Sequence, residues 1–316
     1  MRATCYSLIV PVYRNEDTID KMLNVVEALT TRLEGKLELV VVVDGSPDSS
    51  YLLLRQGLAA RSLRATLIGL SRNFGSFAAI RHGLGVAQGP WFAVMAADLQ
   101  EPPELIESFF ASLENEPVDI VVGVRTGRED PLSVRLPAAI FWSCYRRLVQ
   151  PDMPMRGVDV FGVNRRARDA LLALDEAHSS LVGQLLWLGF RRKQIPYRRR
   201  SNPSRRSGWT LRKRFRHMTD SVFAFTDLPI RLISVTGAVG VGLTVLASTV
   251  VAVAYLRGRI DTPDYAPLVL ALLFSTFLIL MGLGVVGSYV RRSYENSKRR
   301  PHSVELVRDV FGEEST

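Results

Sequence analysis

The sequence lacks the residue patterns that mark disulfide-rich, zinc-binding and repetitive proteins. It has two cysteines among 316 residues, which excludes a disulfide-stapled scaffold and gives no zinc-ligand spacing. Its four histidines are scattered, and no pair has the spacing of metal ligands. Its 23 glycines and 16 prolines follow no period, which excludes collagen-like and low-complexity chains. The apolar content of 47% excludes intrinsic disorder.

Charge is absent from two long stretches near the C-terminus, residues 233–256 and 266–290. Each is longer than the roughly 20 residues that cross a hydrocarbon core of about 30 Å. Helices of a soluble core seldom run so far without a charge, so we predict a two-helix transmembrane anchor over residues 231–292. Glycines within the second stretch would permit close helix approach and homo-oligomerisation through the spans; they are Gly282, Gly284 and Gly287.

The distribution of basic residues predicts the topology of this anchor. Residues 211–231 hold five Lys and Arg and residues 291–308 hold six, whereas the loop between the two stretches, 257–265, holds two. Positive residues stay on the cytoplasmic side of a membrane. We therefore predict a multi-pass protein of the inner (cytoplasmic) membrane with both termini in the cytoplasm. Residues 293–316 would form a cytoplasmic tail.

The first 207 residues show the pattern of an α/β domain. Short, almost continuously apolar runs alternate with partly helix-periodic segments, as expected of strands covered on both faces. The runs are 6–12, 37–43, 65–70, 91–95 and 118–124, and a further strand-like run follows at 158–163. This order predicts a doubly wound α/β sheet. Ligands of such sheets bind at the carboxyl ends of the strands.

Polar turns follow the first four of these runs. They are residues 11–16 (PVYRNE), 44–48 (DGSPD), 71–75 (SRNFG) and 96–104 (AADLQEPPE). None is the glycine-rich turn of a dinucleotide fold, so we expect no nicotinamide or flavin cofactor. Asp98 could hold a divalent cation against a diphosphate, with Gln100 as a second oxygen ligand. The alternative for this turn is a helix cap before Pro102 and Pro103. Together the four turns favour a nucleotide-diphosphate site.

A basic segment precedes the predicted anchor. Residues 191–216 contain twelve Lys and Arg and no acid, and without them the chain carries a charge of −3. Nucleic-acid binding is one interpretation. The position beside the membrane favours anionic lipid headgroups or a lipid-borne phosphate, so we expect no nucleic-acid partner. Residues 208–230 include one apolar helical stripe (211–225) and would form an interfacial amphipathic helix. An ordinary packed helix is the alternative.

The turns and the basic segment resemble those of a known family. VPVYRNED, VVVDGSPDS, LSRNFG, MAADLQEPPEL and SGWTLRKR resemble motifs of family 2 glycosyltransferases of the GT-A fold, within them the polyprenyl-phosphate type. This group includes dolichyl-phosphate mannose synthases and bactoprenol glucosyltransferases. The resemblance implies a GT-A mixed sheet and an inverting transfer of one sugar. The donor would be a uridine- or guanosine-diphosphate sugar, and the acceptor the phosphate of a membrane polyprenol. The product would serve cell-envelope glycan assembly.

The resemblance also implies roles for individual residues. The nucleotide-sugar pocket would be lined by Pro11, Tyr13, Glu16, Asp44, Asn73, Ala97 and Asp98. Mg²⁺ or Mn²⁺ would be held by Asp98 and Gln100. The acceptor phosphate would meet Arg125, Arg135, Arg206 and Ser207. The catalytic residues would be Asp98 and Asp159, the latter orienting the sugar or acting as a base.

The sequence departs from the family pattern at two acids. Ala96 stands where the family usually has the first acid of Asp-x-Asp, and Val43 stands where it often has the first of two aspartates. Mg²⁺ keeps several waters and takes one or two carboxylates, so Asp98 alone can support activity. The loss of the acid at Ala96 also supports a second hypothesis, a catalytically weakened membrane scaffold with a glycosyltransferase fold.

Overall fold

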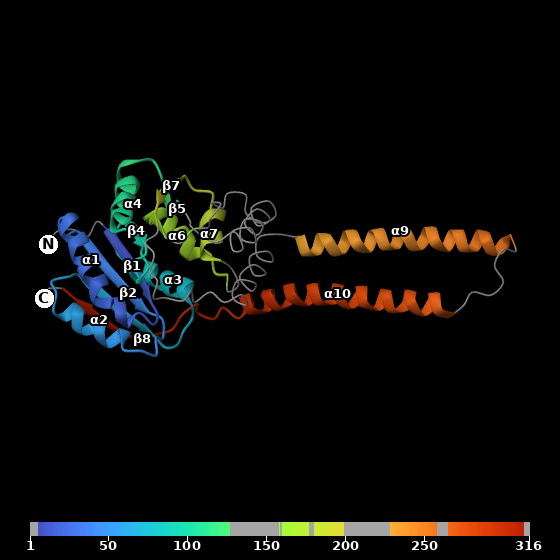
Figure 1. Cartoon of the computed structure of the whole chain (residues 1–316), viewed down its shortest axis with the longest axis horizontal. Helices are drawn as coiled ribbons and strands as arrows, with labels where there is room; N and C mark the ends of the chain where they lie inside the picture. The colour runs from blue at the N-terminus through green and yellow to red at the C-terminus, as the bar shows by residue number, and fades with distance from the viewer. Residues whose placement is uncertain are drawn as a thin grey trace.

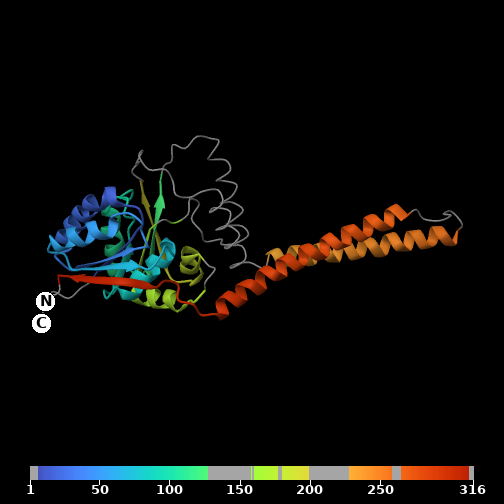
Figure 2. The ribbon, with the colours of Figure 1, turned by 90° about the horizontal axis from the view of Figure 1, so that it is seen from below.

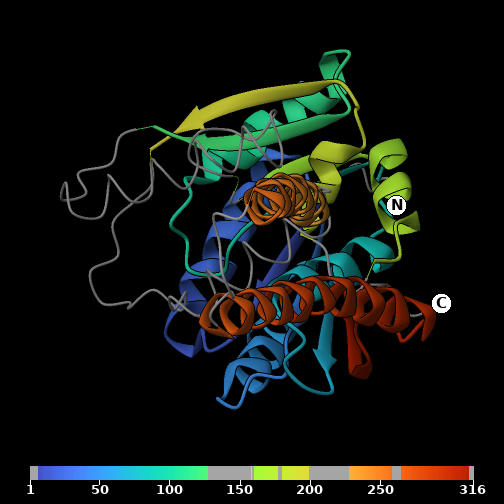
Figure 3. The ribbon, with the colours of Figure 1, turned by 90° about the vertical axis from the view of Figure 1, so that its right-hand side faces the viewer.

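The computed structural model describes residues 6–126, 158, 160–176, 180–198, 228–257 and 265–312. Within them the chain forms an α/β domain and a long helical hairpin that projects from one side of it (Figure 1). Seen along the hairpin axis, both hairpin helices extend from the same side of the domain (Figure 3). The domain and the hairpin are therefore two distinct regions of one chain.

The centre of the domain is an eight-stranded sheet in the order β7-β5-β6-β4-β1-β2-β3-β8. Strand β1 pairs in parallel with β2 and β4, β2 with β3, and β5 with β7. Strand β6 runs antiparallel between β4 and β5, and β8 runs antiparallel to β3. The strands are Tyr6–Val12 (β1), Leu37–Val43 (β2), Ala65–Leu70 (β3), Trp91–Val94 (β4), Ile120–Arg125 (β5), Phe161–Asn164 (β6), Arg192–Tyr197 (β7) and Glu305–Phe311 (β8). The predicted α/β class with a mixed, GT-A-like sheet is confirmed.

Helices cover both faces of this sheet. One apolar cluster joins the sheet to α1 (Ile19–Arg32), α2 (Ser50–Ala59) and α4 (Pro103–Asn115), with the 3-10 turn η1 (Glu16–Thr18) leading into α1. The other cluster joins the opposite face to α3 (Ser76–Val86), α6 (Arg165–Ala173) and α7 (Leu181–Trp187). Leu8 and Val10 of β1 belong to the first cluster and Ile9 to the second, because successive side chains of a strand point to opposite faces.

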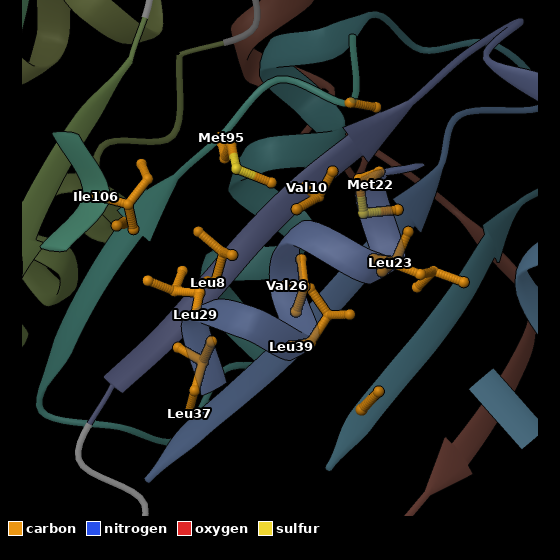
Figure 4. Close-up of a cluster of buried hydrophobic side chains, with 14 of the residues drawn as sticks. Leu8, Val10, Met22, Leu23, Val26, Leu29, Leu37, Leu39, Met95 and Ile106 are labelled. Carbon is orange, nitrogen blue, oxygen red and sulfur yellow. The ribbon is translucent and has the colours of Figure 1, made fainter. Parts of the chain in front are cut away.

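The first cluster shows why these runs become central strands. Val26 and Leu29 of α1 lie against Leu8 of β1 and Leu39 of β2, and all four side chains are fully buried or nearly so (Figure 4). Burying one such side chain contributes about 1.5–3 kcal/mol. A strand that is apolar at almost every position buries such side chains on both faces of the sheet, so both faces contribute to its stability. The predicted bounds of β1, β2 and β3 agree with the structure for this reason.

The hairpin consists of α9 (Leu228–Leu256) and α10 (Tyr265–Ser297). Among the described residues, the stretch Phe274–Ser297 is long and apolar enough to cross a membrane, judged by length and composition. A Cβ added at Gly282 of α10 would lie 3.9 Å from Ile233 Cγ2 of α9, whereas one at Gly284 or Gly287 would meet nothing within 4 Å. The two helices thus approach at Gly282. The two-span membrane anchor remains a prediction.

Two strands were not predicted from the sequence. Residues 293–316 were expected to be a tail, but the structure places Glu305–Phe311 in the sheet as β8, next to β3 (Figure 2). Likewise, the first part of the basic segment forms the edge strand β7. The physical reason is the same in both cases. Polar and charged residues interrupt the apolar ones in both strands (RKQIPY and ELVRDVF), and each strand pairs with a partner that is distant in sequence. The predicted helix 211–225 lies outside the described residues.

Candidate active site

Four polar turns meet at the carboxyl edge of the sheet, where β1, β2, β3 and β4 end. The turns after β1 and β2 are joined by hydrogen bonds. The Arg14 backbone N–H donates to Ser46 Oγ at 2.8 Å, and the Asn15 N–H donates to Ser50 Oγ at 3.3 Å. In the other direction, the Ser49 N–H donates to Glu16 Oε2 at 3.1 Å. Glu16, predicted to bind the nucleotide sugar, thus also satisfies an N–H at the start of α2.

Asp44 connects the second turn to the third. The Phe74 N–H donates to its Oδ1 at 2.7 Å, and the Gly75 N–H donates to its Oδ2 at 2.8 Å. The side chain is buried, and burial raises the pKa of Asp44 while these two N–H groups and Arg72 act in the opposite direction. Both carboxylate oxygens are therefore engaged with the backbone of residues 74 and 75. The contact of Asp44 with the nucleotide sugar stays a prediction. Its hydrogen bonds to the backbone of the third turn are a role that the sequence did not indicate.

Gly45 explains how closely these turns approach. Its φ is +55°, and a Cβ added there would lie 2.2 Å from the Arg72 carbonyl carbon and 2.5 Å from the Asn73 nitrogen. No side chain fits at such distances, so the third turn crosses the second directly over a glycine. Asn73 is exposed at this crossing, and its contact with the nucleotide sugar stays a prediction. Val43, which stands where the family often has an aspartate, is buried in the first apolar cluster.

The turn after β4 carries the predicted metal ligands. Asp98 and Gln100 are both half-buried, and Ala97 is buried before them. Leu99, between the two, packs against the first apolar cluster and has a φ of 53°. A non-glycine residue in this left-handed region costs about 1–2 kcal/mol. The packing of Leu99 therefore holds the backbone between Asp98 and Gln100 in an unfavourable conformation.

The oxygen donors of this turn fit a hard divalent cation. One carboxylate and one amide oxygen stand close in sequence, and Mg²⁺ uses one or two carboxylates and takes its other ligands from water and phosphate. Among the described residues, no group of three or more His, Cys, Asp and Glu could hold a metal. The candidate ligands in this turn are therefore the side-chain oxygens of Asp98 and Gln100, and their role as metal ligands stays a prediction.

Thr18 ties this turn to the first one. Its hydroxyl donates to the Ala97 carbonyl oxygen at 3.0 Å and lies 3.3 Å from Asn15 Nδ2, which donates to it. Sequence reasoning did not single out Thr18, and only its place just after the first polar turn could have indicated it. Arg72 was not predicted as a site residue either. It is exposed, and its Cζ lies 4.0 Å from the centroid of the Phe74 ring. Arg72 brings a positive charge to the edge where a diphosphate is expected.

Other predicted site residues lie around these turns. Tyr13 is 38% exposed, and Pro11 pairs with Val42 in the sheet at the end of β1. Arg125 is the last residue of β5, a strand that points the same way as β4, so it reaches the same edge. The remaining predicted residues lie outside the described ranges; these are Arg135, Asp159, Arg206 and Ser207.

Part of the basic segment has partners within the domain. Lys193 Nζ of β7 forms an ion pair with Glu116, and Arg191 Nε lies 3.5 Å from Asp119 Oδ2. Arg192 donates to the Leu186 carbonyl oxygen at 3.2 Å. Residues 191–193 therefore have carboxylate and carbonyl partners within the domain, and lipid contact by the basic segment stays a prediction.

The chain is similar to known glycosyltransferases. The chain is 29% identical to an uncharacterized glycosyltransferase of Synechocystis (97% of this chain, 95% of the other). It is 30% identical to undecaprenyl-phosphate 4-deoxy-4-formamido-L-arabinose transferase of Pseudomonas fluorescens (94% and 88%). Among solved structures, glucosyl-3-phosphoglycerate synthase of Mycobacterium tuberculosis aligns with a TM-score of 0.49 at 17% identity (70% and 78%). The model of glycosyl transferase family 2 matches residues 7–171, and the chain belongs to that family.

Proposed function

We propose that this glycosyltransferase moves a single sugar from a nucleotide-diphosphate sugar to the phosphate of a membrane polyprenol, with inversion at the anomeric carbon. One observation carries the proposal. The polar turns lie at the same edge of the sheet at which the chain returns from the hairpin, since α10 ends at Ser297 and Val304 accepts a hydrogen bond from the Ser71 N–H at 2.9 Å. A donor site at the base of an apolar hairpin suits a lipid-borne acceptor.

The similarity to relatives supports the acceptor class. A relative covered over most of its length acts on undecaprenyl phosphate by its name. Large apolar side chains are exposed along the hairpin, including Leu243 at 62% and Phe274 at 66%. Such surfaces are stable in hydrocarbon rather than in water. We therefore propose that α9 and α10 span the cytoplasmic membrane and that the α/β domain works on its cytoplasmic side.

On the donor side, the hydrogen-bonded turns would hold the nucleotide. Tyr13 and Pro11 would contact the nucleoside, and Asn73 and Arg72 would contact its sugar or diphosphate. Asp98 and Gln100 would hold Mg²⁺ or Mn²⁺, which when bound neutralises charge on the diphosphate leaving group. Because Asp44 and Thr18 fix the neighbouring turns, these groups are oriented before the donor binds, and pre-orientation lowers the barrier.

On the acceptor side, the nucleophile is a phosphate monoester that is already ionised near neutral pH. It needs no strong base, so the reaction depends on positioning and on neutralising charge. We propose that Arg125 meets this phosphate together with Arg135, Arg206 and Ser207. Asp159 would orient the sugar or accept a proton. A phosphate oxygen attacks the anomeric carbon, the bond to the diphosphate breaks, and the nucleoside diphosphate leaves.

A transfer assay tests the proposal. Full-length protein in detergent would receive polyprenyl phosphate, labelled uridine- or guanosine-diphosphate sugars, and either Mg²⁺ or a chelator. We expect label in the lipid phase with one donor and its loss with the chelator. Folded protein that transfers nothing from any donor would contradict the proposal. It would support the second candidate, a membrane scaffold with a weakened site, which the alanine at position 96 favours.

A further inference from the structure

The segment that follows the hairpin is attached to the candidate donor site. After α10 ends at Ser297, the chain crosses the carboxyl end of β3 and enters β8 at Glu305. The Ser71 N–H donates to the Val304 carbonyl oxygen at 2.9 Å. Ser71 is the first residue of the third polar turn, and the last two residues of that turn bind Asp44. Residues 71–75 are thus held at one end by Asp44 and at the other by Val304.

His82 of α3 fixes this returning segment. Its Nε2 lies 3.2 Å from Glu305 Oε2 and its Nδ1 lies 2.9 Å from Ser303 Oγ. A carboxylate accepts hydrogen bonds but does not donate them, so Nε2 carries the proton that Glu305 accepts, while Ser303 Oγ is the hydrogen-bond partner of Nδ1. Both contacts flank Val304, the residue that binds Ser71. His82 therefore sets the position of the carbonyl oxygen that receives the Ser71 N–H.

A second histidine holds the segment on its other side. His302 Nε2 lies 2.9 Å from Asp175 Oδ1, just after α6. Arg308 binds the Glu305 carboxylate through its Nε at 3.0 Å, and this contact lowers the pKa of Glu305. Residues 302–305 are therefore anchored to α3 and to the chain after α6. Within the described residues, this is where the chain of the hairpin rejoins the domain.

We propose that residues 301–305, held by His82, position the donor-side turn 71–75. Hydrogen bonds would then connect the segment after α10 to the nucleotide site. The proposal rests on the proposed function, because turn 71–75 matters to catalysis only if the carboxyl edge binds the donor. His82 is a positioning residue in this account. It acts through Ser303, Glu305 and the Val304 carbonyl oxygen on the Ser71 N–H.

The test compares His82→Ala, which removes contacts at the start of β8, with a control variant that removes a contact near the other end of β8. Arg55→Ala removes a contact to Asp309 of β8, 3.1 Å from Arg55 Nε, and leaves the Val304 region untouched. His82→Gln keeps one donor for Glu305 and is the conservative variant. Hydrogen exchange of residues 71–75 is measured on full-length protein in lipid nanodiscs. Donor KM and kcat are measured with the sugar that the wild type transfers.

We expect His82→Ala to speed exchange in residues 71–75 about five-fold, as for the loss of one hydrogen bond. Donor KM should rise by a similar factor while kcat changes less than about two-fold. Arg55→Ala should change neither, and His82→Gln should recover part of both. Unchanged exchange in His82→Ala, or equal changes in Arg55→Ala, would overturn the proposal. Exchange needs no turnover, so a wild type that transfers no sugar contradicts the proposed function and leaves this test decisive.

Discussion

The α/β domain and the α9–α10 hairpin are both rich in apolar side chains, but they place them in opposite surroundings. Leu8 and Phe92 of the sheet are 0% exposed, whereas Leu246 of α9 and Leu283 of α10 are each 62% exposed. In the domain, strands pack between two layers of helices. In the hairpin, apolar side chains face outward. Two different surroundings, the protein core and the proposed lipid, therefore accommodate the apolar residues of one chain.

The largest difference between the two regions is expected when one leucine in each is truncated to alanine. Leu8→Ala should lower the free energy of unfolding by about 2–5 kcal/mol, because it leaves a cavity in a closed core. Leu283→Ala should change it by less than about 0.5 kcal/mol, because its side chain lies on an outer surface. Urea unfolding of the domain in detergent measures both. Equal losses would show that Leu283 is a core residue and that the contrast is wrong.

The second prediction separates chemistry from anchoring. Asp98→Ala should lower sugar transfer about 100-fold or more, since a positioned charge at the diphosphate is lost. Melting temperature and membrane extraction should stay at the wild-type values. Asp17→Ala, an exposed acid of η1, is the control and should keep full activity. If Asp98→Ala transfers sugar normally, the turn after β4 holds no essential metal ligand.

The third prediction concerns the turn that Asp44 holds. In Asp44→Asn one acceptor oxygen remains for two backbone N–H groups, and the new NH₂ group opposes one of them. Leaving a buried donor unsatisfied costs about 1–3 kcal/mol. Affinity for a nucleoside diphosphate with Mg²⁺, measured by calorimetry, should fall by about 5- to 150-fold. An affinity within two-fold of the wild type would show that turn 71–75 does not contact the nucleotide.

A smaller effect is expected where β8 meets α2. Tyr51 Oη donates to Asp309 Oδ2 at 3.0 Å, and burial together with Asp309 raises the pKa of Tyr51 to about 12. The hydroxyl therefore remains a donor throughout the neutral range. Tyr51→Phe should destabilise the domain by about 1 kcal/mol at pH 7 and leave the hairpin unaffected. Thermal unfolding with hydrogen exchange of β8 measures this; unchanged stability would show that the contact contributes nothing net.

The smallest effect is a dependence of β8 on pH. The hydrogen bond with Arg308 is the largest cause that lowers the pKa of Glu305, and His82 acts in the same direction. A lowered carboxyl pKa stabilises the fold above the unfolded value of about 4.3, and this contribution is lost as pH falls through the lower folded value. The protection factors of the β8 amides, which correct for the intrinsic exchange rate at each pH, should therefore be smaller below about pH 4 than at pH 7. In Glu305→Gln this additional change should disappear.

Sequence alone predicted the parts that local pattern determines. The bounds of β1, β2 and β3 follow from almost continuously apolar runs, and the helices α9 and α10 follow from long uncharged stretches. It missed β7, where RKQIPY is too polar to stand out, and β8, whose pairing with β3 joins residues over 230 positions apart. Contacts between distant segments decide such edge strands, and one sequence does not display them.

The candidate site was predictable to a similar extent. The position of the turns at strand ends follows from the α/β pattern, and so do Asp98 and Gln100 as oxygen donors. The engagement of Asp44 by Phe74 and Gly75 could not be foreseen, because it depends on the path of the third turn over Gly45. Nor could the pairing of Lys193 with Glu116, which required knowing that β7 lies beside α4.

The pairing of β3 with β8 has a consequence for biosynthesis. Strand β8 leaves the ribosome after β3 and after the whole hairpin, because both precede it in the chain. The edge of β3 therefore stays open until both hairpin helices have been made, and unpaired strand edges invite aggregation. If the proposed insertion of the hairpin into the bilayer takes place while the chain is being made, the sheet closes after that insertion. The last edge of the domain would then form on a chain that is already at the membrane.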